Sequence, residues 1–236
     1  GVFERKQDLS YIGVKRTKRT VMSFLLMVFL VPAAFAVPNL QLYIPGGTYN
    51  TSSETWITSS QSFEVWVIAS NLDRLSSPIY DVTLTAALGQ GVAAQDGALT
   101  ITPVGGSAHT YMASEYQFGN PPATGSDAGD LPSHGIFPTN YVEFLCASET
   151  SAPYVETFNM PDGGGPTQGN IFKFYVTTTY AMVHFDAYGF LRTHDGKFIK
   201  APFSHDAEMT AVPEPASMLL FGIGLAGAGL VRRFKK

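Results

Sequence analysis

The hydrophobic pattern between residues 37 and 211 is that of β-strands rather than helices. Apolar and polar residues alternate in short runs, which is typical of strands, and no stretch repeats at the helical spacing of 3.6 residues. Clusters of glycine, proline and serine separate the runs, as turns do. The predicted strands cover residues 39–44, 55–58, 63–68, 79–88, 97–104, 141–146, 171–180 and 182–188.

The clearest alternation lies in residues 79–88 and predicts a strand with one buried and one solvated face. Residues 105–139 carry little periodic signal and predict a long loop. We therefore expect a mainly β fold, an antiparallel β-sandwich of seven to nine strands, with helices confined to the two ends of the chain. In residues 79–88, the expected buried positions are Tyr80, Val82, Leu84 and Ala86, and the expected solvated positions are Asp81, Thr83 and Thr85.

Residues 1–36 have the layout of a secretory signal-peptide helix. A basic region precedes the apolar run 21–31, and Ala34 and Ala36 form the small-x-small pattern of a cleavage site. This order predicts cleavage before Val37. An uncleaved anchor is the alternative, although eleven apolar residues are few for crossing a bilayer.

Residues 212–236 have three parts in a fixed order. Val212-Pro213-Glu214-Pro215 comes first, and the uncharged, glycine-rich run 216–231 follows. As a helix this run would span about 24 Å, which approaches the roughly 30 Å of a bilayer core, so it predicts a short transmembrane helix. A basic stop at the cytoplasmic surface would be formed by Arg232, Arg233, Lys235 and Lys236.

This arrangement resembles the PEP-CTERM sorting signal of Gram-negative bacteria. The resemblance implies that the export translocon carries the chain across the inner membrane and that an exosortase-type membrane protease processes it near Pro213-Glu214-Pro215. The helix would anchor the protein transiently before it reaches the cell surface or the extracellular matrix. By family association, the resemblance also implies a link to exopolysaccharide production and biofilm.

The segment between the two ends is strongly acidic. Residues 37–212 contain five Lys and Arg against sixteen Asp and Glu, a net charge of −11, whereas the whole chain has −4. Nucleic acids and anionic lipids bind basic surfaces, so the charge argues against both as partners.

The sequence thus predicts three parts of the chain. They are a signal-peptide region (1–36), an exported β-domain (37–211) and the sorting signal (212–236).

A second resemblance concerns the exported domain. Residues 184–189 and 201–207, together with the opening 37–44, are similar to the so-called choice-of-anchor domains. Those are exported bacterial domains that carry varied C-terminal anchors. Their biochemical role is generally unassigned, so this resemblance implies export without implying a reaction.

Metal-ligating residue types gather in the last third of the chain. His184 and Asp186 are two residues apart and would share one face of a strand. Histidine and aspartate ligate transition ions, and aspartate also ligates calcium. Structural hydrogen-bonded pairs are the alternative. We therefore predict no cofactor; a divalent-cation site at Asp186, His205 and Asp206, structural rather than catalytic, is a secondary hypothesis.

The sequence contains no G-x-S-x-G elbow, phosphate loop or dinucleotide fingerprint, and no catalytic residue is predicted. The leading hypothesis is a non-enzymatic, exported surface or extracellular-matrix protein. The second hypothesis is a carbohydrate-binding module, in which exposed aromatic side chains stack on extracellular polysaccharide. The candidates for this stacking are Trp56, Trp66, Tyr111, Tyr116 and Tyr188. The third hypothesis is a secreted hydrolase.

Overall fold

A computed structural model describes residues 40–70, 77–123, 130–132, 135–153, 169–204 and 206–211, all within the unit Val37–Lys236. The predicted signal-peptide region (1–36) and the predicted transmembrane helix (216–231) lie outside these residues. Within the described ranges, no helix has the length and hydropathy to cross a membrane. The only helices there are two short 3-10 turns, η1 (Ala94–Asp96) and η2 (Ala113–Glu115).

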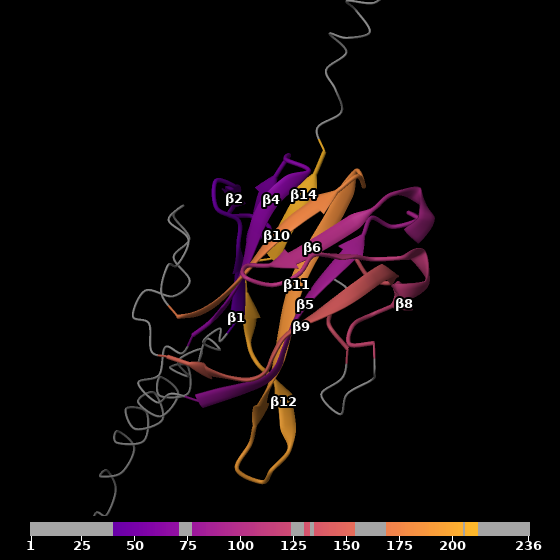
Figure 1. Cartoon of the computed structure of the whole chain (residues 1–236). Helices are drawn as coiled ribbons and strands as arrows, with labels where there is room; N and C mark the ends of the chain where they lie inside the picture. The colour runs from indigo at the N-terminus through magenta and orange to yellow at the C-terminus, as the bar shows by residue number, and fades with distance from the viewer. Residues whose placement is uncertain are drawn as a thin grey trace, which may run out of the picture. The chain divides into compact units, whose positions relative to one another are not determined.

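The described chain forms two β-sheets, and the mainly β class is confirmed (Figure 1). The first sheet has six strands in the order β13 (Phe203–Ser204), β1 (Leu40–Tyr43), β4 (Ser62–Ala69), β10 (Asn170–Thr178), β6 (Leu99–Pro103) and β7 (His109–Thr110).

The second sheet has eight strands. Seven follow the order β2 (Thr48–Asn50), β3 (Thr55–Thr58), β14 (Asp206–Thr210), β11 (Met182–Arg192), β5 (Ser77–Leu88), β9 (Thr139–Ala152) and β8 (Gln117–Gly119). The eighth, β12 (Phe198–Lys200), pairs with the far end of β11, and their hairpin projects at the bottom of Figure 1.

Two strand pairs are parallel, so the prediction of purely antiparallel sheets was wrong. β1 runs parallel to β13, and β14 runs parallel to β3. The described residues also hold fourteen strands rather than seven to nine, because several strands are only two to four residues long. Such short segments are too brief to show a clear period of two in the sequence.

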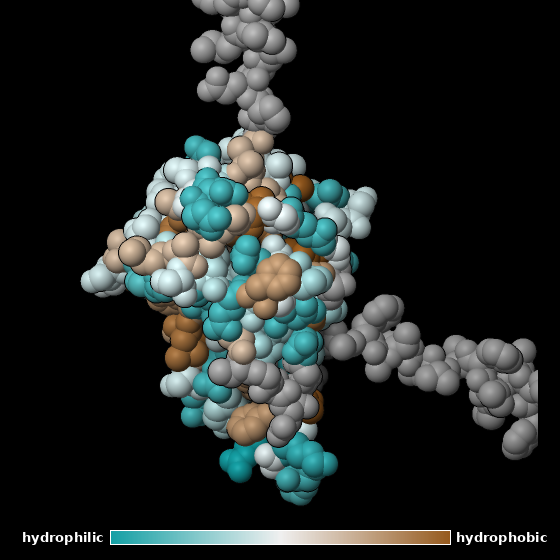
Figure 2. All heavy atoms as spheres, turned by 90° about the vertical axis from the view of Figure 1, so that its right-hand side faces the viewer, coloured by the Kyte–Doolittle hydropathy of each residue, from teal (hydrophilic) through white to brown (hydrophobic). Residues whose placement is uncertain are grey.

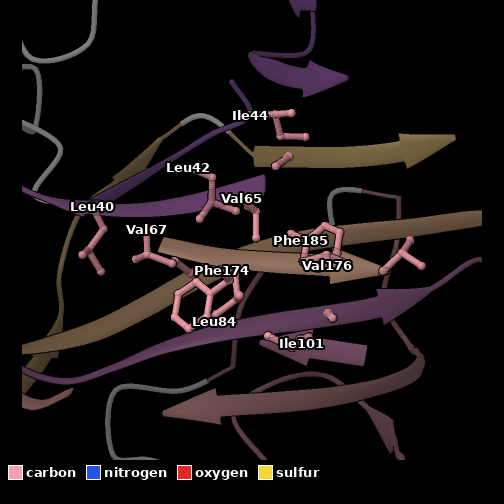
Figure 3. Packing of buried hydrophobic residues seen from close by; sticks show 14 of the residues in the cluster. Leu40, Leu42, Ile44, Val65, Val67, Leu84, Ile101, Phe174, Val176 and Phe185 are labelled. Atoms are coloured by element: carbon pink, nitrogen blue, oxygen red, sulfur yellow. The ribbon is translucent and has the colours of Figure 1, made fainter. Parts of the chain in front are cut away.

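The two sheets enclose one large hydrophobic core, the arrangement that a β-sandwich has. Figure 3 shows Leu42, Phe174 and Val176 of the six-stranded sheet near Leu84 and Phe185 of the eight-stranded sheet. Two edge-to-face aromatic pairs cross between the sheets, at centroid distances of 5.8 and 5.2 Å. These pairs are Phe63–Phe185 and Phe144–Phe174.

An irregularity in β5 breaks the predicted alternation. Asp81 has a φ of 50°, and the pairing with β9 shifts register between Val82 and Thr83. As a result Ile79 and Val82 both face the core, although they are three residues apart. Tyr80, predicted to be buried with Val82, instead packs edge-on against Phe198 at 5.6 Å.

Of the three positions of β5 predicted to be solvated, Asp81 is exposed, but Thr83 is only 5 % exposed and Thr85 is fully buried. Residues from the segment after β8 lie over part of this face. Their apolar side chains form a second, smaller core with β5, β9 and β11. The buried members of this cluster are Ala87, Leu131, Phe137, Tyr141 and Tyr188.

The predicted loop 105–139 contains short ordered elements in its described part, namely β7, η2 and β8. Tyr111 and Tyr116 pack against the main core and Phe137 joins the second core, whereas Phe118 is 74 % exposed. The view in Figure 2 shows hydrophobic residues scattered among hydrophilic ones rather than gathered in one large patch.

Candidate metal centre

Strands β11 and β14 bring four ionisable side chains together on the outer face of the eight-stranded sheet. The antiparallel register pairs His184 with Glu208 and Phe185 with Ala207. Alternate residues of a strand share a face, so Asp186 lies on the same side of the sheet as His184, and Asp206 on the same side as Glu208. We call His184, Asp186, Asp206 and Glu208 the His184 cluster.

The imidazole of His184 lies between the three carboxylates. Its Nε2 atom is 3.6 Å from Oδ2 of Asp186 and 3.7 Å from Oδ2 of Asp206. Its Nδ1 atom is 3.5 Å from Oε2 of Glu208. One ligand atom each from His184, Asp186 and Asp206 can be chosen so that all three lie within 4.8 Å of one another.

The cluster is buried on one side and partly open on the other. The side chains of His184 and Asp186 are 4 % and 1 % exposed, whereas those of Asp206 and Glu208 are 20 % and 23 % exposed. Burial lowers the pKa of His184, but the three carboxylates outweigh it and raise this pKa to about 10. The same contact with His184 lowers the pKa of Glu208.

The structure brings together two of the three predicted metal-site residues. Asp186 and Asp206 meet, while His205 lies outside the described residues. The imidazole of the cluster comes from His184, whose predicted common face with Asp186 is confirmed. Sequence reasoning missed Glu208. Residues 206–210 do alternate polar and apolar side chains, and this signal predicts a strand with Asp206 and Glu208 on one face.

A second, partly buried carboxylate lies on the same outer face, further across the sheet. Glu143 of β9 accepts hydrogen bonds through Oε1 from the amide of Ala123 and the hydroxyl of Tyr188, each at 3.0 Å. We call these three residues the Glu143 anchor. Burial raises the pKa of Glu143, and the two hydrogen bonds oppose this effect. The anchor ties the segment after β8 to β9 and β11.

One further histidine–carboxylate pair lies on the surface and has the distance of a hydrogen bond. His109 Nε2 lies 2.8 Å from Glu115 Oε1, and both side chains are more than a third exposed. Backbone and imidazole contacts lower the pKa of Glu115. This pair has the geometry of a surface hydrogen bond, so it serves as a reference for the longer distances in the His184 cluster.

The single cysteine lies beside a groove at the rim between the sheets. The groove has a volume of about 310 Å³ and is lined mainly by apolar residues of β6, β9 and β10. Burial raises the pKa of the Cys146 thiol to about 12, so it is a poor nucleophile at neutral pH. Cys146 therefore behaves as a small hydrophobic residue.

The chain carries a PEP-CTERM sorting motif. The family described as the PEP-CTERM protein-sorting motif matches residues 211–233. The prediction of this signal from Pro213-Glu214-Pro215, the apolar run and the basic cluster is therefore confirmed. The motif implies an exported protein that is sorted by an exosortase, a membrane protein, with transient membrane anchoring before release at the surface.

Comparison with solved structures yields only distant likenesses. One of them is AvmM, which catalyzes macrocyclization in alchivemycin A biosynthesis. It is 12 % identical, the match covers 75 % of this chain and 92 % of that chain, and the TM-score is 0.33. The CBM3a-L domain from the scaffoldin cipA of Clostridium thermocellum is 12 % identical, with 71 % and 75 % covered and a TM-score of 0.23.

A family 3a carbohydrate-binding module from the same scaffolding protein is 11 % identical, with 60 % and 80 % covered and a TM-score of 0.23. No curated protein matches the chain. At these identities and scores, none of the neighbours carries an argument about what this chain does.

The aromatic residues named for sugar stacking do not form an exposed row. Trp56 and Tyr188 are 4 % and 7 % exposed, and Tyr111 and Tyr116 pack against the core. Trp66 lies on the outer face of the six-stranded sheet, where the ammonium of Lys173 is 4.0 Å from its ring centroid. The carbohydrate-binding hypothesis therefore has no aromatic platform among these five residues.

Proposed function

We propose that residues 37–211 form a non-enzymatic surface or extracellular-matrix domain, exported through the translocon and processed at its C-terminus by an exosortase-type protease. The destination would be the exopolysaccharide or biofilm matrix around the cell. The resemblance of this domain to choice-of-anchor domains stays a prediction that agrees with the proposal.

The observation that carries the proposal is the position of the sorting motif relative to the last strand. β14 pairs with β3 on one side and β11 on the other, and the amide of Ala211 donates a hydrogen bond to the carbonyl of Ala181 at 2.8 Å. The motif begins at residue 211. Cleavage within Pro213-Glu214-Pro215 would therefore leave every described strand on the released side.

The chemistry of the tripeptide agrees with a processing site. Pro213 and Pro215 have no backbone N–H, and the residue before a proline avoids the helical region. The backbone here would favour an extended form, as a protease requires. The excess of negative charge in residues 37–212 would keep the released domain soluble and away from anionic membranes.

The test is alanine replacement of Pro213, Glu214 and Pro215 in a host that carries the sorting protease. We expect the wild-type chain to be recovered as a shorter, released form and the triple variant as a larger, membrane-bound form. Ser217→Ala, which leaves the tripeptide intact, is the matched control and should be processed like the wild type. An identical mature C-terminus in all three, measured by mass spectrometry, would contradict the proposal.

A further inference from the structure

We propose that His184, Asp186 and Asp206 bind a divalent first-row transition ion, with Zn²⁺ as the best-fitting member, and that Glu208 positions the imidazole. The site lies on the outer face of the eight-stranded sheet. The site contains no residue of the sorting motif, so a test of metal binding does not test the proposed function.

The first argument is the spacing of the ligand atoms. Nε2 of His184 lies 3.6 and 3.7 Å from Oδ2 of the two aspartates, and one ligand atom from each of the three residues lies within 4.8 Å of the others. Ligands at about 2.0–2.2 Å from a tetrahedral zinc ion are about 3.3–3.6 Å apart. The distances from the imidazole to the two aspartates are thus close to those between two ligands of one ion.

The second argument is the orientation of the histidine ring. One nitrogen, Nε2, faces both aspartates, while the other, Nδ1, faces Glu208 at 3.5 Å. Histidines that bind metals commonly donate their other N–H to a carboxylate, which fixes the ring and raises its basicity. Glu208 occupies the place of that carboxylate.

The third argument is charge. The cluster gathers three carboxylates around one imidazole. Continuing the register from Phe185 and Ala207 places Asp186 opposite Asp206. Like charges directly opposite each other on neighbouring strands are destabilising. A divalent cation between the two aspartates would offset their repulsion.

A neighbouring side chain points to a further ligand. Thr85 of β5 is paired with Asp186 and is fully buried, and within the described part of the chain its Oγ1 has no hydrogen-bond partner. A hydroxyl with no partner is costly in such a place unless a bound group satisfies it. A water that completes the coordination of the ion beside Asp186 is a group of that kind.

The donor set selects the class of ion. Imidazole nitrogen suits Zn²⁺ and its first-row neighbours, whereas Ca²⁺ takes six to eight oxygen ligands and Mg²⁺ keeps several waters. Three protein ligands leave one tetrahedral position for water. The 20 % exposure of Asp206 provides a path from solvent for the ion.

The experiment uses the full chain, purified in detergent and stripped of metal with a chelator. Calorimetric titration with Zn²⁺ should show one saturable site per chain, and the midpoint of thermal unfolding should rise with Zn²⁺ concentration. Ca²⁺ and Mg²⁺ should bind at least tenfold more weakly than Zn²⁺. Co²⁺ in place of Zn²⁺ should give the visible absorption of a tetrahedral site.

Three variants assign the site. Asp206→Asn should abolish saturable binding, because it removes a charged ligand at the open side of the cluster. Glu208→Gln should weaken binding by about 10–100-fold, as changes to an orienting carboxylate do. Glu115→Gln alters the exposed carboxylate beside His109 and should bind Zn²⁺ like the wild type. Circular dichroism of each metal-free variant checks that it is folded.

Two results would overturn the proposal. Equal Zn²⁺ affinity in wild type and Asp206→Asn would place the ion elsewhere on the chain, and the His184 cluster would then be only an ion-pair network. Tighter binding of Ca²⁺ than of Zn²⁺ would exclude a transition-ion site. If Asp206→Asn does not fold, the wild-type stoichiometry and Glu208→Gln still decide between the outcomes.

Discussion

The outer face of the eight-stranded sheet holds two groups of buried and partly buried polar side chains, whose charges are satisfied in different ways. In the Glu143 anchor, one carboxylate accepts two hydrogen bonds of 3.0 Å from neutral donors. In the His184 cluster, one imidazole faces three carboxylates at 3.5–3.7 Å. The anchor has the distances of short hydrogen bonds, whereas the imidazole–carboxylate distances in the cluster are longer and within the range of ion pairs.

The difference follows from what each group connects. Glu143 ties the backbone at Ala123 to the sheet, so it needs only donors of hydrogen bonds, and the protein supplies them. The cluster joins two neighbouring strands that are already hydrogen-bonded along their backbones. Its concentration of charge is therefore not required for pairing β11 with β14. A buried group of charges that the fold does not need is a candidate for function.

The largest loss of stability is expected from His184→Leu in the metal-free chain. The variant removes the cationic partner of the buried Asp186 and keeps a side chain of similar bulk. Removing one member of a buried ion pair typically costs about 3–5 kcal/mol in the free energy of unfolding. Urea denaturation with a chelator present measures this cost.

The control for this variant is His109→Leu at the exposed pair with Glu115. Surface ion pairs are screened by solvent and contribute little to stability, so the loss there should be much smaller. Equal losses at the two histidines would show that the His184 cluster is no more demanding than a surface contact. The contrast between the two polar groups would then disappear.

The sequence predicts much of the fold class and half of the cluster. Short apolar alternations indicate the β class, and the spacing of two between His184 and Asp186 predicts their common face. Both are properties of single strands. The meeting of β11 with β14 depends on which strands pair, and no local pattern encodes that choice. The short strand 206–210 had to be recognised before Asp206 and Glu208 could be placed together.

The failures in β5 have a different origin. Thr83 and Thr85 read as solvated because they alternate with apolar residues, and in many sheets the polar face is wet. Here residues after β8 lie over part of that face, and their apolar members Leu131 and Phe137 are far away in sequence. Asp81 adds an irregularity that shifts Tyr80 off the core face. Both effects are tertiary.

A smaller loss of stability is expected from Tyr188→Phe, which tests the hydrogen bonding of the Glu143 anchor. The variant removes the hydroxyl that donates to Glu143 and leaves the ring in the second core. The loss of one hydrogen bond to a charged group costs about 1.5–3 kcal/mol. Denaturation should show this loss, and the Zn²⁺ affinity of the chain should stay the same. A changed Zn²⁺ affinity would mean that the two polar groups are coupled.

The smallest net effect is expected from Glu143→Gln, which separates the charge of the anchor from its hydrogen bonds. The amide oxygen can still accept from Ala123 and Tyr188, so the free energy of unfolding near pH 7 should change by less than about 0.5 kcal/mol or rise slightly. The variant also removes the cost of burying a carboxylate, which opposes the weaker acceptor strength of the amide.

The pH dependence distinguishes the two contributions. Burial raises the pKa of Glu143 in the folded chain, so the folded state holds this proton at a pH where the unfolded state has lost it. The contribution of Glu143 to stability is therefore full below its unfolded pKa of about 4.3 and declines as the pH rises through the folded pKa. Glu143→Gln has no proton to lose here, so the difference in unfolding free energy between wild type and variant should shift toward the variant as the pH rises above 4.3. Urea denaturation at a series of pH values measures this difference. A difference that shifts toward the wild type would mean that the hydrogen bonds from Ala123 and Tyr188, rather than burial, control the charge of the anchor.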